Sequence, residues 1–187
     1  MNNDTLFITN SLTIGIGYFT NQIPQFEMKK GEFIHLKGKN GSGKTTFVKT
    51  ILNEIHPVEG SIKHGIDLND ITYIKQESFK KILLPINVEE WLKIYNAIEL
   101  GKTLLPNRIL SQTFKSLSGG EKQKLSIISK IQSTRSLLIL DEPFNHIDTS
   151  SRLEIMSFLS SLLNKAMLSG ILIISHHDFD GVRVIEI

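Results

Sequence analysis

Residues 38 to 45 have the types and spacing that bind phosphate groups. They read Gly-Lys-Asn-Gly-Ser-Gly-Lys-Thr, which fits the pattern G-x-x-x-x-G-K-[ST] in full. Glycines let the backbone curl so that several N–H groups point at one anion, and a helix that begins there adds its partly positive N-terminus. Lys44 supplies a full charge for the β- and γ-phosphates, and the Thr45 hydroxyl is a hard oxygen ligand for Mg²⁺. The loop predicts nucleoside-triphosphate binding, because a mere glycine turn matches this pattern in only about one chain in a hundred.

Two neighbouring carboxylates, Asp141 and Glu142, follow the apolar run Leu137–Leu140. Asp141 can hold Mg²⁺, and Glu142 can polarise an attacking water as a general base. His176 follows another apolar run and can hydrogen-bond a γ-phosphate. Each has an ordinary alternative, since Asp-Glu after a strand is usually a solvated turn and such a histidine is more often structural. Their assignment therefore depends on their position relative to the phosphate loop.

The elements that must position these residues alternate short β-branched runs with longer helical patterns. The apolar runs 137–140 and 171–174 lack polar alternation, which is typical of parallel strands covered on both faces. We expect strands at Leu12–Ile16, Glu32–Lys37, Ser61–Lys63, Ile71–Ile74, Leu137–Leu140, Ile171–Ile174 and Val182–Ile187. We expect helices at Lys44–Asn53, Val88–Ala97, Gly120–Gln132 and Ser150–Leu168.

The last of these helices has an apolar repeat at three- and four-residue steps. Its predicted buried face comprises Leu153, Met156, Leu159, Leu163 and Met167. We expect Ser150 or Ser151 to cap its start and Gly170 to end it. The segment from 77 to 116 has no convincing strand and is predicted to be a small helical insertion.

Composition excludes several classes of protein. A chain of 187 residues has room for one domain, and a hydrophobic share of 40% is ordinary for a globular protein. It has no cysteine, which excludes a disulfide scaffold, and its longest apolar runs are far shorter than the roughly 18 residues that span a bilayer. The net charge of +2 is too balanced to indicate a nucleic-acid partner. The first residues lack the basic start and apolar stretch of a signal peptide.

A second cluster of residues narrows the class. Leu117-Ser118-Gly119-Gly120-Glu121-Lys122-Gln123 precedes a long helical pattern, and the strand ending in Asp141-Glu142-Pro143 follows it. With the phosphate loop, this order resembles the ATP-binding-cassette (ABC) ATPases, whose signature is LSGGQ and whose Walker B strand ends in Asp-Glu. The resemblance implies an α/β P-loop fold with a mostly parallel sheet, a small antiparallel β region and a compact helical subdomain. It implies one domain over 1–187, with a core of 1–76 and 117–187 and a helical subdomain at about 77–116.

The resemblance also implies a role for each matching residue. Glu142, His176 and Gln76 would be catalytic, with His176 preferred over the adjacent His177. Thr45, Gln76 and Asp141 would meet Mg²⁺, and Asp148 would be the D-loop aspartate. The expected ATP ligands are Gly38, Asn40, Gly41, Ser42, Gly43, Lys44, Thr45 and Thr46, together with an adenine-stacking aromatic residue, Tyr18 in preference to Phe19.

The signature residues Ser118, Gly119 and Gly120 would face ATP held by a second cassette. The resemblance therefore implies a head-to-tail dimer with another copy or a related cassette, and two ATP molecules between them. Glu121 departs from the usual glutamine and would bring a carboxylate near that interface.

The expected function is ATP hydrolysis that powers transport through a separate membrane permease, with export of a peptide or small molecule favoured. The cassette would then lie on the cytoplasmic face of the membrane, bound through its permease. Ile82, Leu83, Leu84, Trp91 and Tyr95 are either an apolar docking groove for that permease or the core of the helical subdomain. The alternative is a non-transport ATPase acting on the ribosome, because residues 142–148 resemble the EPTNHLD pattern of ABC-F proteins. A role in cluster assembly or DNA repair has less support.

Overall fold

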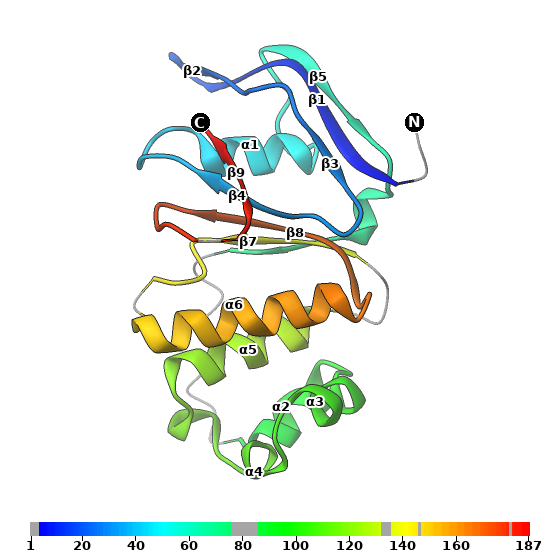
Figure 1. The fold of residues 1–187 in the computed structure, drawn as a ribbon, viewed down its shortest axis with the longest axis vertical. Helices are drawn as coiled ribbons and strands as arrows, with labels where there is room; N and C mark the ends of the chain where they lie inside the picture. Colours follow the sequence, from blue (N-terminus) through cyan, green and yellow to red (C-terminus); the bar gives the residue numbers. More distant parts are fainter. Residues whose placement is uncertain (1–3, 76–85, 132–135, 146, 180) are drawn as a thin grey trace.

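The computed structural model describes residues 4–75, 86–131, 136–145, 147–179 and 181–187. Its elements lie in layers (Figure 1). An antiparallel sheet lies at one end, followed by helix α1 (Lys44–Ile51), a parallel sheet, and the helices α5 (Gly119–Lys130) and α6 (Thr149–Asn164). Helices α2 (Val88–Ile94), α3 (Ile98–Leu104) and α4 (Asn107–Leu110) lie at the other end. The predicted α/β class with two kinds of sheet and a helical part is confirmed.

The parallel sheet has the strand order β6-β7-β8-β4-β9. Its strands are β6 (Ile71–Ile74), β7 (Ser136–Asp141), β8 (Leu168–Ser175), β4 (Phe33–Lys37) and β9 (Arg183–Glu186), and every neighbouring pair is parallel. The side chains of 137–140 and 171–174 are fully buried, as the unbroken apolar runs predict. Because parallel strands end at one edge, the segments after β4, β7 and β8 meet there.

The antiparallel sheet is larger than the sequence predicts. It contains β1 (Thr5–Ile16), β2 (Phe19–Gln22), β3 (Glu27–Lys29) and β5 (Glu59–His64), with β1 pairing all three others. The prediction missed β2, β3 and the first half of β1. In β1 the polar residue Thr9 interrupts the apolar pattern, yet it is fully buried. Its hydroxyl donates to the Pro24 carbonyl at 3.0 Å and accepts from the Phe26 N–H at 2.9 Å, which makes its burial tolerable.

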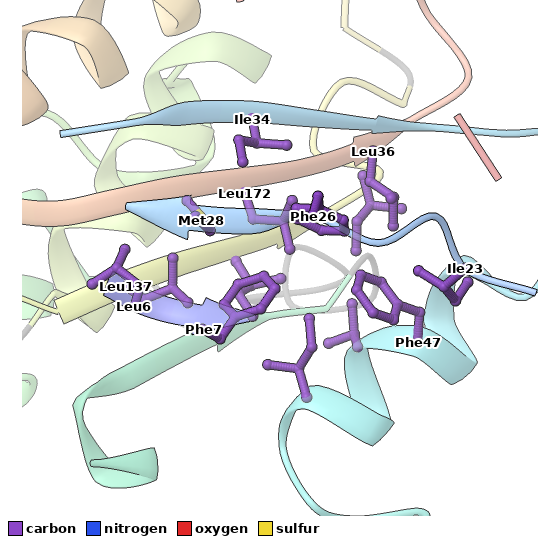
Figure 2. Packing of buried hydrophobic residues seen from close by; sticks show 14 of the residues in the cluster. Leu6, Phe7, Ile23, Phe26, Met28, Ile34, Leu36, Phe47, Leu137 and Leu172 are labelled. Carbon is purple, nitrogen blue, oxygen red and sulfur yellow. The ribbon is translucent and has the colours of Figure 1, made fainter. Parts of the chain in front are cut away.

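A hydrophobic core fills the space between the antiparallel sheet, α1 and the parallel sheet (Figure 2). Phe7 of β1, Phe26 and Phe47 of α1 form its aromatic part, with ring centroids 5.6 Å and 6.1 Å apart. Ile34, Leu36, Leu137 and Leu172 close the core from the parallel sheet. These contacts hold α1, and therefore the loop before it, firmly against the sheet.

The buried face of α6 differs from the predicted one. The fully buried residues are Ile155, Leu159 and Leu162, whereas Leu153 is 68% exposed. The helix carries two overlapping apolar stripes, and the stripe that faces the parallel sheet packs in the core. Asp148, and neither Ser150 nor Ser151, accepts the capping hydrogen bond, and the helix ends at Asn164.

Gly170 lies inside β8 and does not terminate α6. A Cβ at this position would come within 2.5 Å of the Leu6 side chain. The glycine is therefore needed for close packing of β8 against the antiparallel sheet.

The helical part has its own core. Trp91 is 9% exposed, lies 5.0 Å from the Phe114 ring, and donates its indole N–H to Ser129 Oγ at 2.6 Å. Asn87 and Glu90 form a capping box at the start of α2. Short 3₁₀ turns lie at Leu68–Asp70 and Phe114–Ser116. None of the helices in the described residues is long and apolar enough to cross a membrane.

Candidate functional site

The phosphate loop connects β4 to α1 at the carboxyl edge of the parallel sheet. Gly41 and Gly43 have positive φ angles of 83° and 96°, a conformation that L-residues with a Cβ rarely adopt. Gly43 is the residue at the start of α1, and none of the described side chains caps that start. The first N–H groups of the helix therefore point into the mouth of the loop, where an anion can accept them.

Lys44 lies within the curl of this loop. Its Nζ donates to the carbonyls of Gly38 and Lys39 at 2.7 Å and 2.9 Å, and the residue is only 7% exposed. The loop thus holds a positive charge beside its own backbone N–H groups. This arrangement suits a polyphosphate chain.

A pocket of about 320 Å³ lies in front of the loop. It brings together residues from three separate parts of the chain. The edge of the parallel sheet gathers the segments after β4 and β7, and the start of β2, from the antiparallel sheet, adds Phe19. The lining residues are Phe19, Asn40, Gly41, Gly43, Lys44, Thr45, Thr46, Asp141 and Glu142. All but Phe19 were predicted from the sequence as ATP-site, magnesium-site or catalytic residues, and Phe19 was the second choice for the adenine-stacking ring.

Asp141 receives two hydrogen bonds on one oxygen. Thr45 Oγ1 donates to its Oδ2 at 3.2 Å and the Tyr73 hydroxyl donates to the same atom at 2.8 Å. Burial raises the pKa of the Asp141 carboxyl, and these two hydrogen bonds oppose that rise. Burial and the neighbouring Asp141 also raise the pKa of the Tyr73 hydroxyl, so it remains a donor.

Thr45 and Asp141 fit a magnesium ion bound together with phosphates. Both offer hard oxygen atoms on the same side of the pocket. The described residues contain no cluster of three or more His, Cys, Asp or Glu side chains that would enclose a metal. Mg²⁺ usually retains waters and binds through one or two protein oxygens plus substrate phosphates, which is the donor set present here. Gln76, the third predicted ligand, lies outside the described residues.

Glu142 and His176 contact each other at the rim. His176 Nδ1 lies 3.1 Å from Glu142 Oε2, and the Glu142 side chain is 12% exposed. Glu142 has a positive φ of 48°, an uncommon conformation for a residue with a side chain. Its N–H is held by the carbonyl of Ile174 at 2.8 Å. The turn therefore holds the carboxylate beside Asp141 and against the histidine.

The side chain of His177 contacts Arg152. Its Nδ1 lies 3.2 Å from Arg152 Nη1, and burial is the main cause that lowers the pKa of the His177 ring. Of the two adjacent histidines, the structure places His176 against Glu142. The sequence also favoured His176 over His177. The catalytic role of His176 stays a prediction.

The segment around His176 is anchored to β4. His35 is fully buried, and its Nε2 lies 3.1 Å from the Ser175 carbonyl. The Phe179 ring packs on the His35 ring at 4.9 Å, and Lys37 pairs with Asp178. These contacts keep the residues after β8 close to the phosphate loop.

The structure brings Phe19 to the pocket and does not bring Tyr18 there. Ile16 pairs with Phe19 across the hairpin, so Gly17 and Tyr18 form its two-residue turn. Tyr18 is fully exposed, whereas a Cβ on Gly43 would lie 3.2 Å from the Phe19 ring. The turn geometry thus reverses the preference for Tyr18 that the sequence suggested. Which ring stacks on adenine stays a prediction.

Sequence reasoning missed three residues that support the site. Asn21 of β2 donates from Nδ2 to the Ser42 carbonyl in the phosphate loop at 2.8 Å. Tyr73 holds Asp141, and His35 holds the segment before His176. None of the three belongs to a contiguous motif. Only the strand alternation around them could have indicated which of them face inward.

The signature residues lie apart from the pocket. Ser118 caps α5 through a capping box, in which its Oγ accepts from the Glu121 N–H at 3.2 Å and its N–H donates to Glu121 Oε2 at 2.9 Å. Ser118 and Gly119 are exposed, and Gly120 is buried against Ser151. Glu121 therefore turns back on its own helix, where Arg108 lies 3.6 Å from its other oxygen.

Asp148 caps α6 next to the signature segment. Its Oδ1 accepts from the Ser151 N–H at 2.9 Å. The Ser150 hydroxyl and the Ser151 N–H hold the pKa of the Asp148 carboxyl far below its usual range. The exposed starts of α5 and α6 are neighbours because Gly120 packs against Ser151.

Trp91 lies in the core of the helical part and not in an open groove. Tyr95 is half-buried and lines a surface groove with Asn96, Leu100 and Ile131. Ile82, Leu83 and Leu84 lie outside the described residues. For Trp91, the core alternative is therefore the correct one.

Comparison with known proteins identifies the family. The family model described as ABC transporter matches residues 22–145, more than half of the chain. An uncharacterized ABC transporter ATP-binding protein, YfmM of Bacillus subtilis (strain 168), is 34% identical over 91% of this chain and 33% of its own length. The zinc import ATP-binding protein ZnuC of Buchnera aphidicola subsp. Schizaphis graminum is 29% identical over 81% of this chain and 65% of its own length. The chain thus spans about a third of the length of YfmM and about two thirds of the length of ZnuC.

Solved structures show the same fold. An inward-facing metal-chelate type ABC transporter has a TM-score of 0.76 at 21% identity, over 93% of this chain and 74% of that one. The archaeal ribosome recycling factor aABCE1, in complex with the ribosomal stalk protein aP1, has a TM-score of 0.71 at 29% identity, over 94% of this chain and 35% of that one. ATP hydrolysis is the activity known for this kind of domain. With its matching family model, its fold and its phosphate loop, this chain belongs to the ABC transporter family as an ABC ATPase domain.

Proposed function

We propose that this chain binds and hydrolyses ATP to power transport through a separate membrane permease. The observation that carries the proposal is the convergence of Lys44, Thr45, Asp141 and Glu142 on one pocket while Ser118 and Gly119 stay exposed elsewhere. Such a pocket offers groups for the phosphates and for the Mg²⁺ of a nucleotide. The signature residues are free to meet the nucleotide of a second cassette.

The side chains have the following proposed roles. Lys44 and the loop N–H groups bind the β- and γ-phosphates. Thr45 and Asp141, with Gln76, hold Mg²⁺, which supplies charge neutralisation for the phosphates. Glu142 accepts the proton of the attacking water, and His176 orients its carboxylate through their hydrogen bond.

The remaining ATP contacts are proposed for the loop and one aromatic ring. Gly38, Asn40, Gly41, Ser42, Gly43 and Thr46 surround the phosphates. Phe19 is now preferred to Tyr18 for the adenine, because Phe19 lines the pocket.

We propose a dimer in which Ser118, Gly119 and Gly120 complete the ATP site of a second cassette. Asp148 would lie at the same interface, because the starts of α5 and α6 are neighbours. The second cassette can be another copy, a related chain or another part of a longer protein. In this proposal residues 1–76 and 117–187 form the nucleotide-binding core and about 77–116 the helical subdomain, within one domain over 1–187.

Membership of the ABC transporter family supports a proposal for the partner and the place in the cell. We propose binding to a membrane permease on the cytoplasmic face, with no nucleic-acid partner in that role. The sequence favours export of a peptide or small molecule, whereas the Buchnera relative is named for zinc import. The direction of transport and its cargo therefore depend on identifying the permease.

One experiment tests the transport role. The chain would be coexpressed with a neighbouring gene product that has several hydrophobic spans, and the membrane fraction would be assayed for the chain and for ATP hydrolysis. Recovery on membranes only in the presence of that partner supports the proposal. Failure of the purified chain to bind Mg-ATP would contradict it at its first step.

A second candidate is an ATPase that acts on the ribosome. It is favoured by the 29% identity to the ribosome recycling factor aABCE1 and by the sequence after Glu142. ATP-dependent cosedimentation with ribosomes, absent in a Lys44→Ala variant, would select this candidate over the transporter.

A further inference from the structure

Tyr73 touches the Asp141 carboxylate although it belongs to none of the motifs discussed above. We propose that Tyr73 is a positioning residue that sets the orientation of Asp141 and thereby the affinity of the site for magnesium with ATP. The inference rests on the proposed function and deepens it. It concerns a side chain on β6, a strand none of whose described residues lines the pocket.

The register of the parallel sheet explains how Tyr73 reaches Asp141. Tyr73 pairs with Ile139 across β6 and β7, so Asp141 lies two residues further along the neighbouring strand. Side chains two residues apart along a strand point to the same face. The step is about 6.6 Å along the strand and about 4.8 Å across to its neighbour, so the two Cα atoms lie about 8 Å apart. The side chains of Tyr73 and Asp141 together bridge that distance, and the Tyr73 hydroxyl lies 2.8 Å from Asp141 Oδ2.

The hydrogen bond from Tyr73 makes the two Asp141 oxygens different in their contacts. Oδ2 accepts from Tyr73 and from Thr45 Oγ1. Among the described residues, no hydrogen bond reaches Oδ1. Two donors fix Oδ2 and thereby the orientation of the carboxylate, which leaves Oδ1 available as an oxygen ligand in the pocket that Asp141 lines. Partners that orient a metal-binding carboxylate typically change metal affinity by about 10- to 100-fold when removed.

The ring of Tyr73 has a separate structural role. It packs against the hydrophobic core, and Lys75 Nζ lies 5.6 Å from its centroid. Phenylalanine preserves both contacts and removes only the hydroxyl. Tyr73→Phe therefore isolates the hydrogen bond to Asp141.

The test measures ATP binding at increasing Mg²⁺ by calorimetry on the full chain, and repeats it with EDTA in place of Mg²⁺. We expect Tyr73→Phe to raise the half-saturating Mg²⁺ concentration by about 10-fold and to leave metal-free ATP binding unchanged. Ser161→Ala is the matched control, because it removes a hydroxyl hydrogen bond within α6, to Phe158, outside the pocket. It should behave as the unmodified chain. In an Asp141→Asn background, Tyr73→Phe should have a much smaller effect.

Two results would overturn the inference. One is a Mg²⁺ dependence of Tyr73→Phe equal to that of the unmodified chain. The other is an equal loss of ATP binding with Mg²⁺ and with EDTA, which would indicate general damage to the loop. If the unmodified chain itself binds no Mg-ATP, the proposed function fails and the inference with it. That outcome is seen before any variant is compared.

Discussion

The nucleotide pocket and the signature segment differ in how their residues are held. In the pocket, Lys44 and Asp141 are almost fully buried; Lys44 is held by carbonyls of its own loop, and Asp141 is held by Thr45 and Tyr73 from other elements. At the signature, Ser118 and Gly119 are exposed, and Ser118 is held by a hydrogen-bond pair within the first turn of its own helix. The placement of Asp141 in the pocket depends on tertiary structure, whereas the cap of the signature depends on local sequence.

This difference has a functional meaning. Buried charged groups with fixed partners are costly to build, and they are retained where a charged ligand must be bound in one geometry. An exposed, capped helix start suits a surface that meets its ligand only when a second molecule supplies it. Changes in the pocket should therefore abolish binding or chemistry, and changes at the signature should be mild in the isolated chain.

Lys44→Ala should cause the largest loss. Removing the buried ammonium should weaken ATP binding by about 100-fold or more, because charge-assisted hydrogen bonds to phosphate are lost. Calorimetric titration with Mg-ATP measures this. Lys39→Ala is the control, since Lys39 lies in the same loop and is exposed. An affinity of Lys44→Ala within a few-fold of the unmodified chain would show that the buried lysine is not a ligand.

Glu142→Gln should separate binding from chemistry. The amide cannot accept the proton of water, so hydrolysis should fall by about 100-fold or more while Mg-ATP binding is retained. Phosphate release and calorimetry measure the two quantities, and Glu99→Gln, on the exposed face of α3, should leave both unchanged.

The same variant tests the dimer. Glu142→Gln should elute as a dimer with Mg-ATP and as a monomer without it. A variant that hydrolyses ATP at the unmodified rate would exclude Glu142 as the base. A persistent monomer at saturating ATP would count against the shared site.

Ser118→Ala should have a smaller effect, confined to stability and association. Loss of the cap should lower the free energy of unfolding by about 1 kcal/mol, with ATP binding by the isolated chain unchanged. Urea unfolding measures the first quantity. Ser157→Ala, at an exposed position within α6, is the control and should not lower the free energy of unfolding. Weakened ATP binding in Ser118→Ala would mean that the two regions are not independent.

The smallest effect should be a pH dependence from His35. Burial is the main cause that lowers the pKa of this ring in the folded chain. The unfolded chain then binds a proton more readily, so His35 should reduce stability as pH falls below its unfolded pKa of about 6.5. Unfolding in urea should need less denaturant at pH 5.5 than at pH 7.5.

Replacing His35 isolates its share of that change. His35→Asn should remove most of the difference between the two pH values, even if it lowers stability at both. His177→Gln is the comparison, because the pKa of His177 is also lowered but the ring is less buried. An unchanged difference in His35→Asn would assign the effect to other groups.

Much of the site was predictable because its chemistry is contiguous. The phosphate loop, the Asp141-Glu142 pair and the signature each carry their residue types at short, fixed spacing. Buried apolar runs likewise predicted β7 and β8. The helix α6 was predicted in the right place but with the wrong face, because two apolar stripes share one helix and only packing against the sheet selects between them.

By itself, the sequence determined which residues could bind phosphate, hold magnesium and activate water, since these groups follow from residue type and local spacing. Only the tertiary structure decided that Phe19 and not Tyr18 lines the pocket, that Asn21 holds the loop, and that Tyr73 orients Asp141. Each of these contacts joins segments more than twenty residues apart or depends on a hairpin turn. Strand register and turn geometry set them, and the spacing of residues within one segment carries no information about either.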